Sequence, residues 1–139
     1  MGKNLLSIRY FVLLVLLVLF TAGSCGARAQ SAKEKREAAY QAKLQSYSDV
    51  LKLGKTRKHV EDYLRGKGVA FGQLCCIDEK SAFADLVYIG KEKHPWYCEE
   101  HNVFIAFQFA AVEPHEGWEA YDSDTLKSIT VFHKFEGCL

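Results

Sequence analysis

The stretch VFIAFQFA, residues 103–110, decides the fold of this chain. Its large apolar residues are Val103, Ile105, Phe107 and Phe109, which stand at alternate positions. Successive side chains of a β-strand point to opposite faces of a sheet, so this alternation predicts a strand with one buried face. We expect 103–111 to be one arm of a hairpin, with 96–98 as the other arm and the polar residues 99–102 as the turn.

The segments on either side predict the rest of an antiparallel sheet. Downstream, Val112–Asp124 is a polar loop and Leu126–Phe135 is expected to be the last strand. Upstream, Val69–Ile77 is expected to be a strand. Leu86–Ile89 fits either a second strand or a short helix capped by Ser81.

A first helix is expected near the start of the folded region. Ser31–Gln45 is rich in Ala, Glu, Lys and Gln, which are strong helix formers, and carries few apolar residues. It is therefore predicted to be an exposed helix or stalk. Tyr47–Leu53 continues into a helical turn that ends at Gly54, because glycine suits the left-handed position after a helix.

A second helix is expected to begin after Thr56, which caps it. Val60, Tyr63 and Leu64 fall on one stripe that faces inward. The polar residues of this helix are expected to stay outside: Arg57, Lys58, Glu61, Asp62 and Arg65. The predicted fold class is α+β, an N-terminal helical pair packed on a three- or four-stranded antiparallel sheet and stapled by disulfides.

The first 29 residues have the three parts of a signal peptide. Lys3 and Arg9 precede the apolar run 10–20, YFVLLVLLVLF, which is too short to cross a bilayer as a helix. A small-x-small cleavage site follows at 27–29, Ala-Arg-Ala. We therefore expect residues 1–29 to be a signal peptide, 30–46 an exposed helix or stalk, and 47–139 a single α+β domain.

Two routes of maturation compete at this segment. Residues 21–25, TAGSC, also resemble the lipobox of bacterial lipoproteins, in which Cys25 would become the acylated first residue. Ala22 departs from the aliphatic residue usual in that motif, so cleavage before Gln30 is favoured. The expected location is periplasmic or secreted, with a membrane-tethered lipoprotein as the alternative.

Charge argues against a nucleic-acid partner. Without residues 1–29 the chain has 15 basic and 17 acidic residues, a formal net charge of −2. Binding to phosphates requires a concentrated basic face. The basic cluster Lys52, Lys55, Arg57 and Lys58 has acidic neighbours in the same segment and fits a solvated helix end.

The remaining cysteines predict a disulfide framework. Once Cys25 is set aside, four are left, an even number that suits an oxidising compartment: Cys75, Cys76, Cys98 and Cys138. A direct bond between Cys75 and Cys76 would strain the peptide link. We therefore expect each of these two residues to bond one of Cys98 and Cys138, which leaves two connectivities open.

The helix junction carries a resemblance to a known family. The pattern Leu51-x-x-Gly54-x-Thr56-x-x-x-Val60-x-x-x-Leu64, with a sheet after it, resembles the SmpA/BamE-like lipoproteins of outer-membrane assembly and the related fold of the β-lactamase inhibitor protein. The chain departs from the family in having GKGV at 66–69 in place of Gly-x-Pro, and in its four cysteines. The resemblance implies a protein that binds other proteins through its sheet face.

Three potential metal ligands, His94, Cys98 and His101, lie within eight residues, and zinc accepts both nitrogen and sulfur. No second ligand pair completes a site, and Cys98 is expected in a disulfide. The vicinal pair at 75–76 lacks the Cys-x-x-Cys spacing of redox proteins. We therefore expect no cofactor and no metal, and name no catalytic residue.

Aromatic residues outside the core are the expected contacts with a partner. Trp96 and Tyr97 are expected to fill the core, whereas Trp118 and Tyr121 lie in a polar loop and are the candidate binding residues. The predicted function is an exported, non-enzymatic module that binds a protein or an envelope component. The alternative is a small exported metal-dependent or thiol-dependent enzyme.

Overall fold

The computed structural model describes residues 31–75, 77, 83–114 and 120–139. The chain divides into two compact units, residues 1–39 and residues 40–139. In the first unit the described residues, 31–39, are helical and exposed. The expected signal peptide, with Cys25, lies outside the described residues.

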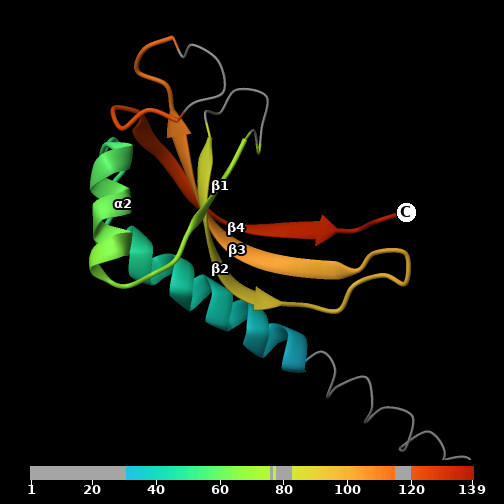
Figure 1. Ribbon diagram of the computed structural model, residues 1–139. Helices are drawn as coiled ribbons and strands as arrows, with labels where there is room; N and C mark the ends of the chain where they lie inside the picture. Colours follow the sequence, from blue (N-terminus) through green and yellow to red (C-terminus); the bar gives the residue numbers. More distant parts are fainter. Residues whose placement is uncertain (1–30, 76, 78–82, 115–119) are drawn as a thin grey trace, which may run out of the picture. The chain divides into compact units, whose positions relative to one another are not determined.

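The second unit is built on a four-stranded antiparallel sheet with the strand order β1-β2-β3-β4 (Figure 1). The strands are β1 (Gly72–Leu74), β2 (Ala84–Lys91), β3 (Glu100–Ala110) and β4 (Thr125–Glu136). A helix over residues 31–48 and the helix α2 (Arg57–Gly66) precede them. The prediction of an α+β chain with helices before an antiparallel sheet is confirmed.

The alternating apolar residues of β3 form the centre of the core. All four, Val103, Ile105, Phe107 and Phe109, are fully buried. The last three share one cluster with Val87 of β2, Leu126 of β4 and four residues from the helical part of the chain: Tyr47, Leu51, Val60 and Leu64. The edge of the Tyr47 ring meets the Phe107 ring, with 5.3 Å between centroids. The periodicity of one strand therefore located the face of the sheet that carries the main core, while Ala84, Leu86 and Ala106 form a smaller apolar cluster.

The Thr56 cap at the helix junction is confirmed, because its hydroxyl accepts a hydrogen bond from the backbone N–H of His59. Gly54 has φ +82°, the expected left-handed conformation, but the helix already ends at Ser48, so Gly54 lies in the turn between the two helices and not directly after a helix end. The junction is also tied to the start of β4. The Gly54 N–H donates to the Leu126 carbonyl at 2.8 Å, and the Leu126 N–H donates to the Lys55 carbonyl at 2.7 Å.

The predicted hairpin is wrong in its first arm and in its turn. Residues 96–97 form a turn rather than a strand, and β3 already begins at Glu100 and pairs with β2. Asn102 lies opposite Lys91 on one side and Lys134 on the other. Pairing on both sides satisfies the backbone of 100–102, so the tertiary context overrides the turn preference of these polar residues.

Two further strand boundaries differ from expectation. The segment around 86–89 is the strand β2 and not a helix, and it is longer than predicted. The strand expected at 69–77 is reduced to the three residues of β1.

Candidate functional site

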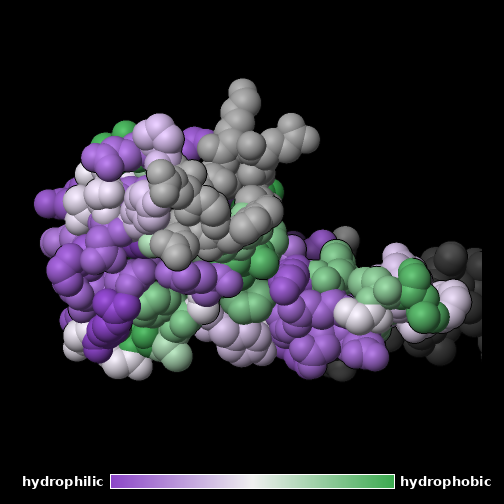
Figure 2. All heavy atoms as spheres, turned by 45° about the horizontal axis from the view of Figure 1, so that its top comes forward, coloured by the Kyte–Doolittle hydropathy of each residue, from purple (hydrophilic) through white to green (hydrophobic). Residues whose placement is uncertain are grey.

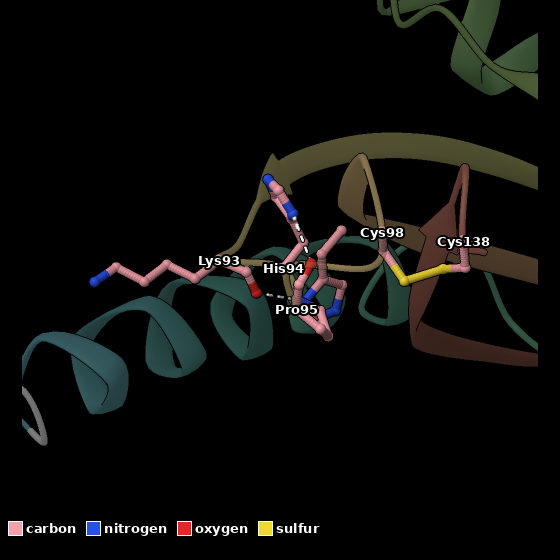
Figure 3. Close-up of a disulfide and its surroundings, with 6 residues drawn as sticks. Lys93, His94, Pro95, Cys98 and Cys138 are labelled. Atoms are coloured by element: carbon pink, nitrogen blue, oxygen red, sulfur yellow. Dashed lines mark hydrogen bonds between the residues drawn. A yellow bond between two sulfur atoms is a disulfide. The ribbon is translucent and has the colours of Figure 1, made fainter.

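The end of the sheet where β2 leads into β3 contains several of the residues that the sequence analysis named as candidate ligands, disulfide cysteines or aromatic contacts. We call it the stapled end and define it as the loop 92–99 together with residues 138–139. Its covalent tie is a disulfide between Cys98 and Cys138, which are 40 residues apart in sequence (Figure 3).

Both disulfide connectivities left open by the sequence are wrong, because Cys98 and Cys138 bond to each other. Cys75 follows β1, whose last residue lies opposite Ala84 at the start of β2, whereas Cys98 lies beyond the other end of β2. Eight residues at about 3.3 Å each separate the two ends by more than about 20 Å, far beyond the reach of a disulfide. Cys75 is itself disulfide-bonded, and Cys76 lies outside the described residues.

Two adjacent aromatic residues project from the stapled end, and we call them the aromatic tip. Trp96 is 90% exposed and Tyr97 is 46% exposed, so the expectation that they fill the core is wrong. Their rings meet edge to face with 5.8 Å between centroids. The signal that could have placed them is Pro95, because proline marks a turn and cannot donate to a sheet ladder.

Backbone hydrogen bonds fix the aromatic tip in addition to the disulfide. The Cys98 N–H donates to the Pro95 carbonyl at 3.0 Å, which closes a tight turn around Trp96. The Leu139 N–H donates to the Tyr97 carbonyl at 2.9 Å. The tip is therefore held on both sides.

The binding residues proposed from sequence are placed only in part. Trp118 lies outside the described residues. Tyr121 is half-buried, and its backbone N–H donates to the Asp124 carboxylate at 3.1 Å. The backbone of Tyr121 thus belongs to the turn that leads into β4.

The ligand set His94, Cys98 and His101 is not formed, because the Cys98 sulfur is bonded to Cys138. The His94 ring contacts the Pro95 carbonyl, 3.1 Å from Nδ1. The buried His101 side chain contacts other residues instead. Its Nδ1 atom lies 3.2 Å from the Lys93 carbonyl oxygen, and its Nε2 atom lies 3.1 Å from Nδ1 of His133.

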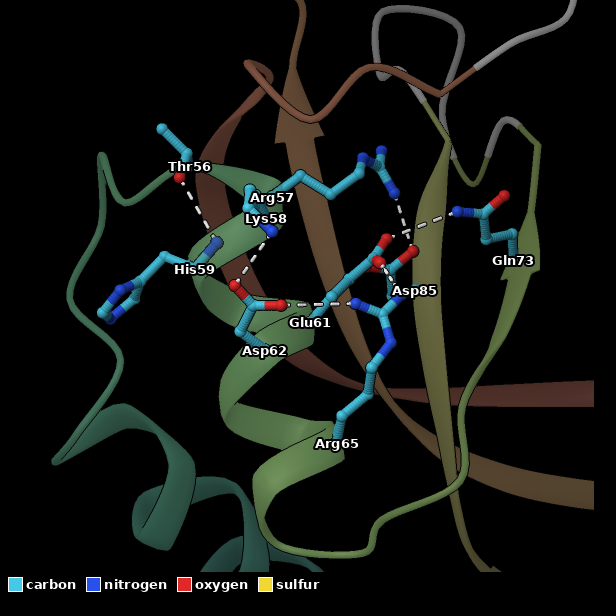
Figure 4. Close-up of polar contacts among 9 residues, drawn as sticks. All are labelled: Thr56, Arg57, Lys58, His59, Glu61, Asp62, Arg65, Gln73 and Asp85. Carbon is cyan, nitrogen blue, oxygen red and sulfur yellow. Dashed lines mark hydrogen bonds and ion pairs between the residues drawn. The ribbon is translucent and has the colours of Figure 1, made fainter.

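A second chemically unusual place lies at the other end of the sheet. Arg57, Asp85 and Asp124 form what we call the buried charge cluster; they are 1%, 0% and 0% exposed. The Arg57 Nη1 atom lies 2.7 Å from an Asp85 oxygen, and Nε lies 3.7 Å from Asp124 (Figure 4 shows the first contact). The expectation that Arg57 stays outside is wrong, because two carboxylates compensate its charge in the interior.

Further contacts complete the surroundings of Arg57. Its guanidinium lies over the Phe109 ring at 4.0 Å, and its Nη2 donates to the Phe83 carbonyl. Glu61 is also buried, against expectation, and pairs with Arg65 on the same helix. Lys58 pairs with Asp62 at the surface, as exposed polar residues of the helix should.

Burial raises the pKa of Asp85 to about 7, and the nearby Arg57 charge opposes this shift without cancelling it. Arg57 faces two carboxylates, so one negative charge is left over when both are ionised, and protonation of Asp85 removes it. The second Asp85 oxygen, Oδ2, has no hydrogen-bond partner among the described residues. The buried charge cluster is therefore poised to exchange one proton near neutral pH.

On the face drawn in Figure 2, hydrophilic side chains gather over α2. The exposed residues of that helix include Lys58, His59 and Asp62. Within the described part of the chain, no helix has the length and apolar character needed to span a membrane. No protein-family model, curated protein or solved structure matches this chain.

Proposed function

We propose that this chain is an exported, non-enzymatic binding module of the cell envelope or the extracellular space, and that the aromatic tip is its principal contact. The observation that carries the proposal is the 90% exposure of Trp96 in a loop that the Cys98–Cys138 disulfide anchors to the C-terminal residues. Covering an exposed tryptophan with a partner removes a large apolar surface from water, and tryptophan and tyrosine are the residues most enriched among energetic hot spots.

The rigidity of the stapled end favours binding. A partner that closes over a mobile loop must offset the entropy of ordering it, whereas a loop fixed in advance loses little. The disulfide and the hydrogen bonds around Pro95 and Tyr97 supply this rigidity. Leu139, fully exposed beside Tyr97, adds apolar surface next to the tip.

Export is proposed from the signal-peptide pattern of residues 1–29, and a disulfide is compatible with it. We also propose that the helical pair packs on the sheet as in SmpA/BamE-like proteins. The shared core of Leu51, Val60 and Leu64 with Phe107 supports this arrangement. By analogy with that fold, we propose that the partner is a protein.

Site-specific crosslinking in intact cells tests the proposal. A photo-reactive residue in place of the exposed His94, beside the tip, is expected to give a discrete adduct. The same residue in place of the exposed Val112, beyond the far end of β3, is the matched control and is expected to give none. Mass spectrometry of the adduct then distinguishes a protein from an envelope component.

A second variant establishes that the tip itself makes the contact. Trp96→Ala, added to the chain that carries the probe at 94, is expected to abolish the adduct while changing the free energy of unfolding by less than about 0.5 kcal/mol, since Trp96 is a surface residue. Adducts of equal yield with and without Trp96 would refute the proposal.

A further inference from the structure

Three side chains able to ligate a metal lie close together where the stapled end meets β3 and β4. They are Glu92, directly after β2, His101 of β3 and His133 of β4, and one ligand atom from each lies within 4.8 Å of the other two. The Glu92 N–H donates to the His101 carbonyl at 2.9 Å, which extends the ladder between the strands. The grouping therefore follows from sheet register and not from a flexible loop.

The two imidazoles already stand at the spacing of metal ligands. His101 Nε2 and His133 Nδ1 are 3.1 Å apart. Two nitrogens bound to one tetrahedral zinc ion at about 2.0–2.1 Å lie about 3.3 Å from each other. A shift of a few tenths of an ångström is enough to place an ion between them. The half-buried Glu92 side chain then reaches the same ion by rotation about its own bonds.

The surroundings of His101 fix the tautomer in which Nε2 has the lone pair. A carbonyl oxygen only accepts hydrogen bonds, so the 3.2 Å contact with Lys93 means that Nδ1 carries the proton and Nε2 offers its lone pair. This second contact, from a histidine N–H to a backbone carbonyl, is the usual support of a metal-bound histidine. The Phe135 ring stacks on the His101 ring at 4.1 Å and holds its orientation. In the metal-free chain the Nε2 lone pair of His101 accepts a hydrogen bond from Nδ1–H of His133, and ion binding requires His133 to adopt its other tautomer, with the proton on its own Nε2.

The two lysines of the flanking strands, Lys91 and Lys134, lie on the opposite face of the sheet. Lys91 and Lys134 are both register partners of Asn102, whereas side chains at odd positions of β3, such as His101, point the other way. Each lysine is also neutralised by a carboxylate at 2.6 Å, Lys91 by Glu100 and Lys134 by Glu136. A cation between the histidines thus meets no unpaired lysine across the strands.

We propose that Glu92, His101 and His133 bind one zinc ion. Two imidazoles and one carboxylate are ligands that zinc prefers, and three protein ligands leave a fourth position for water or for a group of a partner. The site does not depend on the proposed contact through Trp96. Glu92 opens the loop that carries the aromatic tip, so a bound ion ties the base of that loop to β3 and β4.

Calorimetric titration of the untagged protein with zinc tests the site. We expect saturable binding of one ion per chain and a rise in the thermal unfolding midpoint with zinc. His133→Ala removes an exposed ligand, and Glu92→Gln keeps the shape of the side chain but removes its charge; each is expected to weaken binding at least tenfold. His94→Ala, an exposed histidine of the same loop outside the cluster, is the matched control and is expected to bind as the parent does.

Each outcome of the titration either supports or overturns the proposed zinc site. Circular dichroism without metal establishes that each variant is folded, and having two independent variants keeps the test valid if one is not. Absence of one-to-one binding, or equal affinity in the parent and in both ligand variants, overturns the proposal. A loss in His94→Ala as large as in His133→Ala overturns it as well, since binding would then lie elsewhere in the loop.

Discussion

The two ends of the sheet each place a group in an energetically unfavourable environment, and they stabilise it by different means. At one end the buried charge cluster places Arg57 between two carboxylates in the core. At the stapled end, apolar Trp96 is left in water. Non-covalent pairing maintains the first arrangement and a covalent bond maintains the second. The stability of the first end should therefore depend on charge and pH, and that of the second on the redox state of its cysteines.

The largest expected effect comes from breaking the charge cluster. Arg57→Met keeps the length of the side chain but leaves Asp85 and Asp124 buried without their cation, which typically costs about 3–5 kcal/mol. Urea denaturation measures this loss. Lys58→Met, which breaks the surface pair with Asp62, is the control and should change the free energy of unfolding little. Equal losses in the two variants would show that burial of Arg57 carries no special energetic weight.

The second-largest effect is expected from removing the disulfide at the stapled end. Replacing both Cys98 and Cys138 by alanine opens a loop of 40 residues and is expected to reduce the free energy of unfolding by about 2–4 kcal/mol. The same urea experiment at pH 5 and pH 7 should give the same loss at both values. A loss that changes strongly with pH would contradict the division between the two ends.

The smallest of the three effects is the pH dependence caused by Asp85. Its folded-state pKa of about 7 lies above the ordinary value of 3.8, because burial disfavours the charged form. Between these values the folded chain binds more protons than the unfolded chain, so this contribution to stability is present at low pH and is lost as the pH rises toward 7. From pH 5 to 6.5 the parent should lose about 1–2 kcal/mol relative to Asp85→Asn.

Denaturation of the two proteins across this pH range gives the measurement. Glu100 and Glu136 do not obscure it, since hydrogen bonds from Lys91 and Lys134, respectively, lower the pKa of each, and their contributions vanish only in more acidic solution. Parallel stability curves for the parent and Asp85→Asn would contradict the raised pKa.

Sequence patterns predicted the structure at positions where one local physical effect dominates. The alternation from Val103 to Phe109 identified the face of β3 that carries the main core, because large apolar residues at alternate positions of a strand point to the same side. Gly54 and Thr56 marked the helix junction because a left-handed backbone and an unpaired helix N–H have few chemical solutions. These signals supported the prediction of an α+β chain with helices before an antiparallel sheet.

The rest depended on contacts between segments far apart in the chain. Arg57 has the pattern of an exposed helix residue, and its burial becomes favourable only because Asp85 of β2 and Asp124, directly before β4, lie next to it. The disulfide pairing depended on which end of the sheet each cysteine occupies, a property of register. His133 joined the candidate site for the same reason, because β3 and β4 bring it to His101.

The disulfide also turns the segment from Cys98 to Cys138 into a covalent ring that contains β3, the following loop and β4. A protease that cuts one peptide bond inside this ring converts the chain into two fragments that remain joined. The C-terminal strand therefore stays in register after such a nick, and cleavage becomes visible only when the sample is reduced. A first cut in the loop between β3 and β4 would therefore leave these two strands covalently joined.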